Sequence, residues 1–316
     1  MTTSSAPRRG IHAAGLTLLI AVLAGCAHTP QTRQLVEQPP DSLPSRAELT
    51  EVPFFAQQRY QCGPAALAML LTNLDHPTSP SELVDEVYIP ERQGSLRPEM
   101  RAAVRARGFI AYPLEPELRA LFREIAEGRP VLVMQNLGLD WAPLWHYAVA
   151  VGYDLPEREI ILRSGTTERH VTTLATFERT WARSGHWAQV VAPPDRPPAT
   201  AEALAWLEAA RELETTDQTK AARTAYRAAT ERWPDSRTAW MAHGNAAYAA
   251  ERHEEARDAF AHAVELQPES ADGWNNLAHA LATTDCGAAA VSAARCAVAV
   301  ADDPAGPQET LDELEA

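Results

Sequence analysis

Residues 57–66 of this 316-residue chain read Gln57-Gln58-Arg59-Tyr60-Gln61-Cys62-Gly63-Pro64-Ala65-Ala66. Apolar side chains dominate the positions from Cys62 to Leu74, which predicts a mostly buried helix. Pro64 suits the first turn of that helix, because the N–H that proline lacks would be unpaired there anyway. A cysteine at a helix start lies beside unpaired backbone N–H groups and the positive end of the helix dipole, and both lower the pKa of a thiol. The stretch therefore predicts a nucleophilic cysteine at the start of a buried helix.

A histidine far along the chain can supply the base that such a thiol requires. His146-Tyr147-Ala148-Val149-Ala150-Val151-Gly152-Tyr153 is typical of a strand, and a histidine at the edge of a strand can direct its ring into a cleft. Further helices are predicted at 98–107 and 115–128, and further strands at 52–55, 131–134, 159–163 and 187–191. Helices followed by strands indicate an α+β domain.

Together these motifs resemble those of the bacteriocin-processing, double-glycine leader peptidases, which are papain-like cysteine peptidases. The resemblance covers about residues 51–192 and implies an α+β papain-like cysteine peptidase domain. It implies that Cys62 attacks the scissile carbonyl and that His146 takes the thiol proton. Gln57 would donate a hydrogen bond to the oxyanion, with Gln58 as the alternative donor. His186, which also precedes a strand, is an alternative base.

The sequence departs from this family at the residue that orients the histidine. The family places an Asp-Pro pair at the end of the strand after the histidine strand, and here that place holds Leu162-Arg163-Ser164-Gly165. Ser164 would accept the ring N–H of His146, but a hydroxyl cannot stabilise an imidazolium by charge. Asp154, the nearest acid, lies in a predicted hairpin turn. The expected function is therefore a cysteine peptidase, a hydrolase, and the alternatives are an inactive pseudo-peptidase that binds peptides and a hydrolase of cell-wall peptides.

The C-terminal part of the chain repeats with a period of 34 residues. Residues of the same kind recur at this spacing: Trp206, Trp240 and Trp274; Ala222, Ala256 and Ala290; Tyr226 and Phe260; Pro234 and Pro268. This pattern resembles the tetratricopeptide repeat, a helix–turn–helix unit of that length. Small residues let two helices cross closely and aromatic residues fill the seam between them. The resemblance predicts an all-α domain of three repeats at 201–304 that binds a protein partner.

Charge and composition separate the two parts of the chain. From residue 201 onward there are 21 Asp and Glu against 9 Lys and Arg, so most of the net charge of −14 lies there. This imbalance argues against nucleic acid and anionic lipid as partners of that half, and a solvated helical surface is the simplest interpretation. Prolines at 193–198 predict a stiff linker at 193–200, and 305–316 is expected to be an acidic tail.

The N-terminus has the features of a targeting segment. Arg8 and Arg9 precede an apolar run at 16–23, and Leu23-Ala24-Gly25-Cys26 follows. The run is too short to span a bilayer and fits a signal peptide at 1–25. Its end resembles the lipobox of bacterial lipoproteins, which implies lipidation of Cys26 and a membrane anchor. Because Ala27 follows Cys26, the resemblance favours the outer membrane, with the protein facing the periplasm. Residues 26–50 are expected to be a flexible tether.

Several other kinds of site have no support in the sequence. The chain has no Cys-x-x-Cys and no His-Glu-x-x-His, so no metal site is predicted. Its single lysine, Lys220, is not part of a phosphate-binding glycine motif, so neither a nucleotide nor another cofactor is expected. Cys286 and Cys296 are too far apart to be bridged if they share one helix. The tryptophans of the first domain, Trp141 and Trp145 among them, are expected in the core or the cleft wall.

Overall fold

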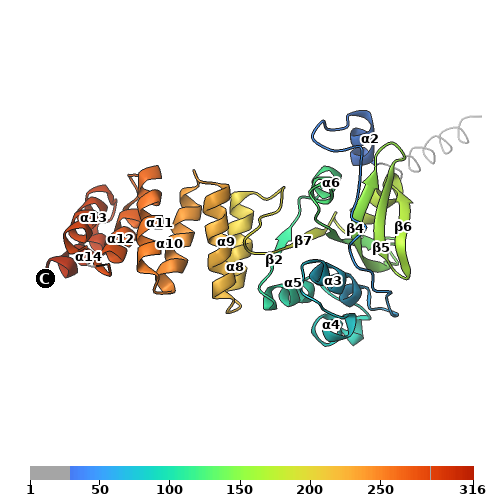
Figure 1. The fold of residues 1–316 in the computed structure, drawn as a ribbon, viewed down its shortest axis with the longest axis horizontal. Helices are drawn as coiled ribbons and strands as arrows, with labels where there is room; N and C mark the ends of the chain where they lie inside the picture. The colour runs from blue at the N-terminus through green and yellow to red at the C-terminus, as the bar shows by residue number, and fades with distance from the viewer. Residues whose placement is uncertain (1–28, 285) are drawn as a thin grey trace, which may run out of the picture.

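The structure is a computed structural model, and it describes residues 29–284 and 286–316. An α+β domain with one central sheet is followed by a stack of paired helices that ends at the C-terminus (Figure 1). The signal peptide at 1–25 and Cys26 lie outside the described residues. Within the described part, no helix has the length and apolar character needed to cross a membrane.

The central sheet has seven strands, and every pairing between them is antiparallel. They are β1 (Arg46–Glu48), β2 (Ile110–Pro113), β3 (Val131–Asn136), β4 (Trp145–Asp154), β5 (Glu159–Ser164), β6 (Thr167–Thr173) and β7 (Ala188–Ala192). Their order is β2-β7-β3-β4-β5-β6, and β1 pairs with the end of β4. The long strand β4 therefore lies in the middle of the sheet, with β3 beside its first residues.

Both faces of the sheet are covered, which explains why the central strands are continuously apolar. Leu132 and Val149 face a core formed with α3 (Cys62–Asn73), α4 (Pro80–Val87) and α5 (Arg97–Ala106). Val133 and Ala148, one position away on the same strands, face the opposite core. That second core is formed with α2 (Pro30–Glu37), α6 (Leu118–Ala126) and α7 (Leu174–Ala182).

The helices and strands predicted from Cys62 onward are confirmed within a few residues, but residues 52–55 form no strand. Pro53 has no N–H to donate to a neighbouring strand. The guanidinium of Arg163 instead binds the carbonyl oxygens of Thr50 and Val52 at 3.0–3.3 Å. Seven elements of the first domain were not predicted from the sequence: α2 (Pro30–Glu37), β1, α4, the 3-10 helix at Pro90–Arg92, β2, β6 and α7. A capping box at α4, formed by Ser79 and Glu82, was a readable signal.

The segment expected to be a flexible tether is largely folded onto the domain. The carboxylate of Glu178 in α7 accepts hydrogen bonds from the backbone N–H groups of Gln31 (3.1 Å) and Thr32 (2.7 Å) in the first turn of α2. Leu35 of the same helix is buried in the core, and β1 adds a strand to the sheet. The described chain is therefore attached to the domain from the first turn of α2 onward.

Three helix pairs form the repeat stack, as the period of 34 residues predicts. They are α8 (Ala203–Glu214) with α9 (Thr219–Arg232), α10 (Arg237–Ala249) with α11 (His253–Leu266), and α12 (Ala271–Ala282) with α13 (Gly287–Val300). A Cβ at Gly244 would lie 2.5 Å from the ring of Phe260, so α10 and α11 need glycine there. The expected acidic tail forms a helix, α14 (Ala305–Glu315), whose Leu311 packs on the last repeat. Cys286 and Cys296 are both free.

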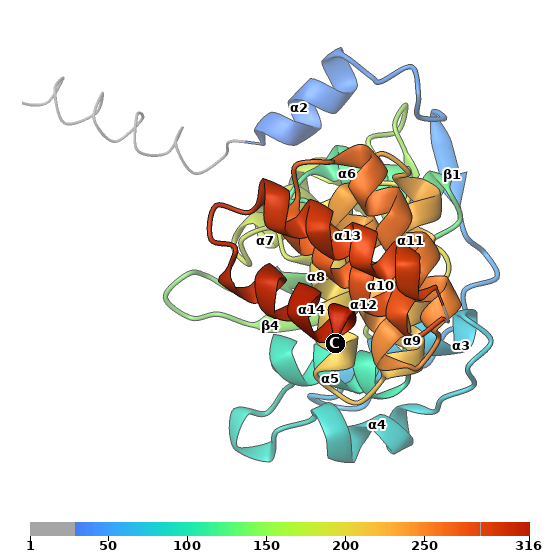
Figure 2. The same ribbon diagram turned by 90° about the vertical axis from the view of Figure 1, so that its left-hand side faces the viewer.

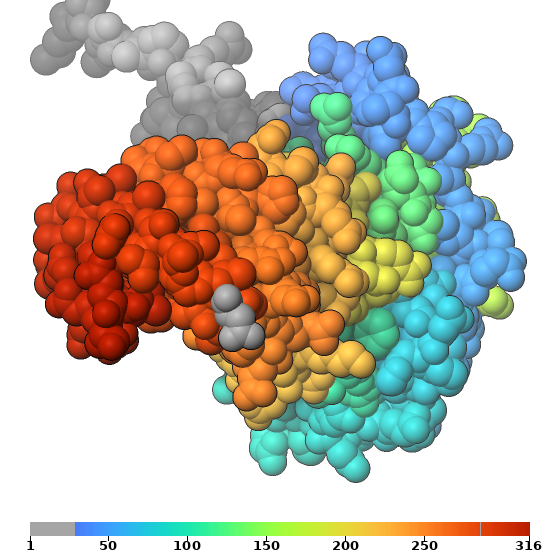
Figure 3. Space-filling model, turned by 60° about the vertical axis from the view of Figure 1, so that its left-hand side comes forward, coloured from blue at the N-terminus to red at the C-terminus, as the bar shows by residue number. Residues whose placement is uncertain are grey.

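The stack and the first domain share one continuous core. Trp206 of α8 is fully buried against Tyr112 of β2, with ring centroids 6.4 Å apart. The buried carboxylate of Glu124 in α6 accepts hydrogen bonds from the backbone N–H and the hydroxyl of Thr200, both at 2.7 Å. Figure 3 accordingly shows the repeat helices continuing directly from the surface of the first domain. The segment at 193–200 therefore packs on the first domain.

Candidate active site

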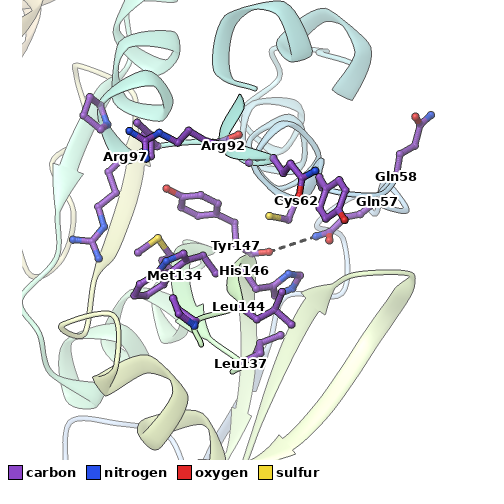
Figure 4. Close-up of a pocket in the computed structure, with 18 residues that line it drawn as sticks. Gln57, Gln58, Cys62, Arg92, Arg97, Met134, Leu137, Leu144, His146 and Tyr147 are labelled. Carbon is purple, nitrogen blue, oxygen red and sulfur yellow. Dashed lines mark hydrogen bonds between the residues drawn. The ribbon is translucent and has the colours of Figure 1, made fainter. Parts of the chain in front are cut away.

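A cleft of about 770 Å³ opens where the start of α3 meets the start of β4, and Cys62 and His146 both line it (Figure 4). The segment between α4 and α5 forms one wall, and the loop between β3 and β4 forms the other. The lining includes no Asp or Glu, and its two charged side chains are Arg92 and Arg97. The cleft is thus basic in a protein that is acidic overall.

Cys62 is the first residue of α3, as the sequence predicted, and its side chain is half-buried. Burial raises the pKa of its thiol, while nearby backbone N–H groups of Tyr147, Gly63 and Cys62 itself oppose that rise. Gly63 is required beside it, because a Cβ there would lie 2.3 Å from the hydroxyl oxygen of Ser95. Since the net shift is upward, the resting group is a neutral thiol.

His146 is the second residue of β4, and its ring Nε2 lies 2.8 Å from the hydroxyl oxygen of Ser164 at the end of β5. Burial lowers the pKa of His146 to about 4, and the charge on His170 acts in the same direction. The ring is therefore neutral at pH 7. A neutral ring that donates its Nε2–H to Ser164 leaves Nδ1 as a free proton acceptor.

Gln57 lies between the strand and the helix start, where an oxyanion donor would be needed. Its backbone N–H binds the carbonyl of Gly165 at 3.0 Å, and its side-chain Nε2 reaches the carbonyl of Tyr147 at 3.4 Å (Figure 4). Gln58 is exposed, and its amide points away from Cys62 in the same view. The structure thus gathers Cys62, His146, Gln57 and Ser164, although no hydrogen bond joins the thiol and the imidazole among the described contacts.

The two alternative residues lie elsewhere in the domain. His186 packs edge-on against Trp181 with ring centroids 4.9 Å apart, and it does not line the cleft. Asp154 ends β4, eight residues from His146, which corresponds to about 26 Å of extended strand. It pairs with Arg46 at 3.4 Å. Neither residue is positioned to act on Cys62.

Three side chains of this cleft were not predicted from the sequence. The hydroxyl oxygens of Tyr147 and Ser95 are buried and have no hydrogen-bond partner in the described structure. Arg97 donates to the carbonyl of Ser184 at 2.6 Å and stacks over Trp187, which brings its guanidinium to the cleft wall. Tyr147 follows His146 directly and could have been named from the alternation of a strand that starts at a cleft. In the described residues, no group of three or more His, Cys, Asp or Glu is gathered as a metal would need.

Comparisons with known proteins identify both parts of the chain. Residues 49–189 match the model of the Peptidase_C39 like family, and residues 207–271 and 242–307 match that of the tetratricopeptide repeat. The chain therefore consists of an α+β Peptidase_C39-like domain followed by an all-helical tetratricopeptide region, which confirms the predicted fold class. A search of curated proteins found no match.

Solved structures resemble each part separately. A C39-like peptidase candidate from Bacillus anthracis is 16% identical, over 48% of this chain and 98% of its own, with a TM-score of 0.40. YrrB, a tetratricopeptide protein with an unusual peptide-binding site, is 21% identical over 36% of this chain, with a TM-score of 0.33, and the chain spans only 58% of its length. The first tetratricopeptide domain of Spaghetti (RPAP3), bound to the HSP90 peptide SRMEEVD, is 12% identical over 36% of this chain and 90% of its own, with a TM-score of 0.34.

Proposed function

We propose that the Peptidase_C39-like domain is a cysteine peptidase that cleaves a secreted or periplasmic protein or peptide, and that the repeats bind the substrate or a second protein. The observation that carries the proposal is that His146 lines the same cleft as Cys62, a cysteine at a helix start, while the ring Nε2 of His146 lies 2.8 Å from the hydroxyl oxygen of Ser164. The anchor belongs to the proposal as well: lipidation of Cys26 would hold the protein on the outer membrane, facing the periplasm.

In the proposed mechanism, the proton of the Cys62 thiol passes to Nδ1 of His146 while the sulfur forms a bond to the scissile carbonyl carbon. Gln57 Nε2 and the backbone N–H of Cys62 donate to the carbonyl oxygen as it becomes an oxyanion. The carbonyl is then restored, the C–N bond breaks, and His146 gives its proton to the leaving amine. Water hydrolyses the resulting thioester, and the proton returns to Cys62.

The test is direct detection of the acyl-enzyme. The chain from residue 27, with Cys286→Ser and Cys296→Ser, would be mixed with peptide p-nitrophenyl esters, quenched in acid and analysed by mass spectrometry. We expect an acyl group on the tryptic peptide that contains Cys62. If no ester acylates Cys62, and His146→Ala does not change its alkylation by iodoacetamide, the peptidase proposal fails. The pseudo-peptidase alternative, which the missing thiol–imidazole hydrogen bond favours, would then stand.

The pH profile is expected to reveal the buried base. Burial lowers the pKa of His146 to about 4, so the ring can still accept a proton well below pH 6.5. It loses this ability only as the pH falls through about 4, where the ring becomes protonated. We therefore expect the acid limb of kcat/KM for ester hydrolysis near pH 4. An acid limb at pH 6.5, the ordinary value for histidine, would contradict the buried neutral ring.

Ser164→Asp is expected to activate Cys62. A carboxylate at this position would favour the imidazolium, which raises the pKa of His146 and in turn lowers that of Cys62. A shift of one to two pKa units in the thiol would accelerate alkylation by iodoacetamide about 10- to 100-fold at pH 6. Ser164→Ala, the matched control, loses the hydrogen bond without adding charge and should slow ester hydrolysis. Equal rates in all three proteins would show that position 164 does not act on His146.

A further inference from the structure

Exposed large apolar side chains gather in the loop between β3 and β4 and at the first residue of β4. Five side chains contribute: Leu137, Leu139, Trp141, Leu144 and Trp145. Trp141 is 83% exposed and Leu139 is 52% exposed, so the tryptophan expected in the core or cleft wall lies in solvent. We call residues 137–145 the apolar loop. Figure 2 shows it projecting at the left, beside β4. Contiguous apolar surface of this kind marks an interaction site.

The apolar loop is held in this conformation by a dense set of hydrogen bonds. The buried side-chain oxygen of Asn136 accepts from the backbone N–H groups of Gly138 (3.0 Å) and Leu144 (2.8 Å). Leu139 and Ala142 exchange two backbone hydrogen bonds, and Arg183 donates to the carbonyls of Asn136 and Gly138. A Cβ at Gly138 would lie 2.4 Å from the carbonyl oxygen of Ala142. The side chains are therefore presented by a preformed scaffold and cannot collapse onto the core.

Position in the domain indicates what covers the loop. Glu178 of α7 binds the first turn of α2, and Arg183, just after the end of α7, binds the apolar loop. Five residues of helix separate these two contacts, about 7.5 Å along the axis. The first turn of α2 and the apolar loop are thus both bound by α7 and the residue that follows it; in Figure 2, α2 lies at the top and the loop projects at the left. Four residues lead from Cys26 to Pro30, a reach of at most about 14 Å.

We propose that the apolar loop inserts into the lipid bilayer on which the protein is anchored, with Leu139 and Trp141 at the point of contact. The inference rests on the proposed lipidation of Cys26, because a reach this short keeps the face that carries α2 near the bilayer. A substrate in the cleft could cover Leu137, Leu144 and Trp145, which line it. It would not cover Leu139 and Trp141, which lie outside the cleft, whereas a bilayer would. Tryptophan beside leucine suits the membrane interface, where an indole keeps its N–H near water.

Charge at this surface is compatible with lipid headgroups. Asp140, the acid within the loop, has Arg183 within 3.9 Å, and the opposite wall of the cleft carries Arg92 and Arg97. The cleft would consequently open beside the bilayer surface, where secreted and anchored chains pass.

The first experiment measures binding of the chain from residue 27, which contains every described element, to vesicles of phosphatidylethanolamine and phosphatidylglycerol. We expect the double variant Leu139→Ser/Trp141→Ser to reduce the bound fraction by about tenfold or more, since it removes two large apolar side chains from the interface. Leu204→Ser is the matched control: Leu204 is 65% exposed but lies on α8, and its loss should change nothing.

The second experiment uses the lipidated full-length protein in vesicles that contain brominated lipids, which quench tryptophan fluorescence on contact. Quenching should be larger for the wild-type protein than for Trp141→Phe. The proposal is overturned if the vesicles bind the double variant as well as the wild type and Trp141→Phe leaves quenching unchanged. The proposal is also overturned if the double variant slows ester hydrolysis in solution and leaves vesicle binding unchanged, because the loop would then bind the substrate. If the double variant instead dissociates a dimer and leaves vesicle binding unchanged, the loop binds a second copy of the chain and the proposal is overturned as well. Acylation of Cys62, measured separately, reports on the peptidase proposal independently of these outcomes.

Discussion

His146→Ala is expected to slow peptide cleavage by about four orders of magnitude at pH 7. In serine proteases, removing the histidine lowers kcat about as much as removing the whole triad. The loss is expected to be smaller in a cysteine enzyme, because some thiolate forms without a base. Here burial raises the pKa of Cys62, so little thiolate is present at neutral pH. The variant therefore loses activation of the nucleophile and protonation of the leaving amine together.

The pH dependence separates these two roles. As the pH rises through the pKa of Cys62, thiolate forms without His146, so the deficit in acylation by esters should shrink while the deficit in amide cleavage persists, because a leaving amine still needs a proton. His186→Ala is the matched control, since His186 was the alternative base and lies outside the cleft. A rate loss in His186→Ala as large as that in His146→Ala would contradict the assignment of the base.

The core of the candidate site was predictable because each of its residues is set in a distinctive local pattern. Cys62 precedes a glycine and a proline at a helix start, and His146 is the second residue of a strand whose next residues are mostly apolar. Ser164 could be placed by counting to the end of the next strand. The contributions of Ser95 and Arg97 were not predictable, because they depend on how two walls from separate segments meet around the cleft.

The fold could be predicted for segments whose structure follows from their own sequence. It could not be predicted for segments whose position depends on a residue far away in the chain. The repeats follow from a period of 34 residues, which each unit carries within itself. Docking of α2 follows from the buried Glu178, more than 140 residues away, whose carboxylate binds two N–H groups. Residues 30–37 contain few apolar side chains, so their sequence does not indicate that this segment packs on the domain. For Trp141 the prediction was wrong in the other direction. A tryptophan is usually buried, but the hydrogen-bonded loop that carries Trp141 holds its side chain in solvent.

Trp206→Ala is expected to destabilise the protein by about 3–5 kcal/mol, the range for removing a large aromatic side chain from a core. Trp206 is fully buried, with an exposed fraction of 0%. Its Nε1–H binds the carbonyl of Ala225 at 2.9 Å, and its ring packs on Tyr112 of β2. Because this core is shared, the loss should lower the stability of the first domain as well as that of the repeats. Denaturant unfolding combined with hydrogen exchange measured on β3, β4 and α11 would test this.

Trp274→Ala provides the control, because Trp274 occupies the same repeat position without the same surroundings. Its ring is half-exposed, and its Nε1–H binds the carbonyl of Pro268 at 2.7 Å. In a repeat stack, stability is transmitted through neighbouring interfaces, so damage at the far end should remain local. We expect a smaller loss, about 1–2 kcal/mol, confined to exchange in α11–α13. If Trp206→Ala likewise left exchange in β3 and β4 unchanged, the two domains would be energetically independent despite their common core. The repeats would then be a separable module, and a partner bound to them could not stabilise the cleft through Trp206.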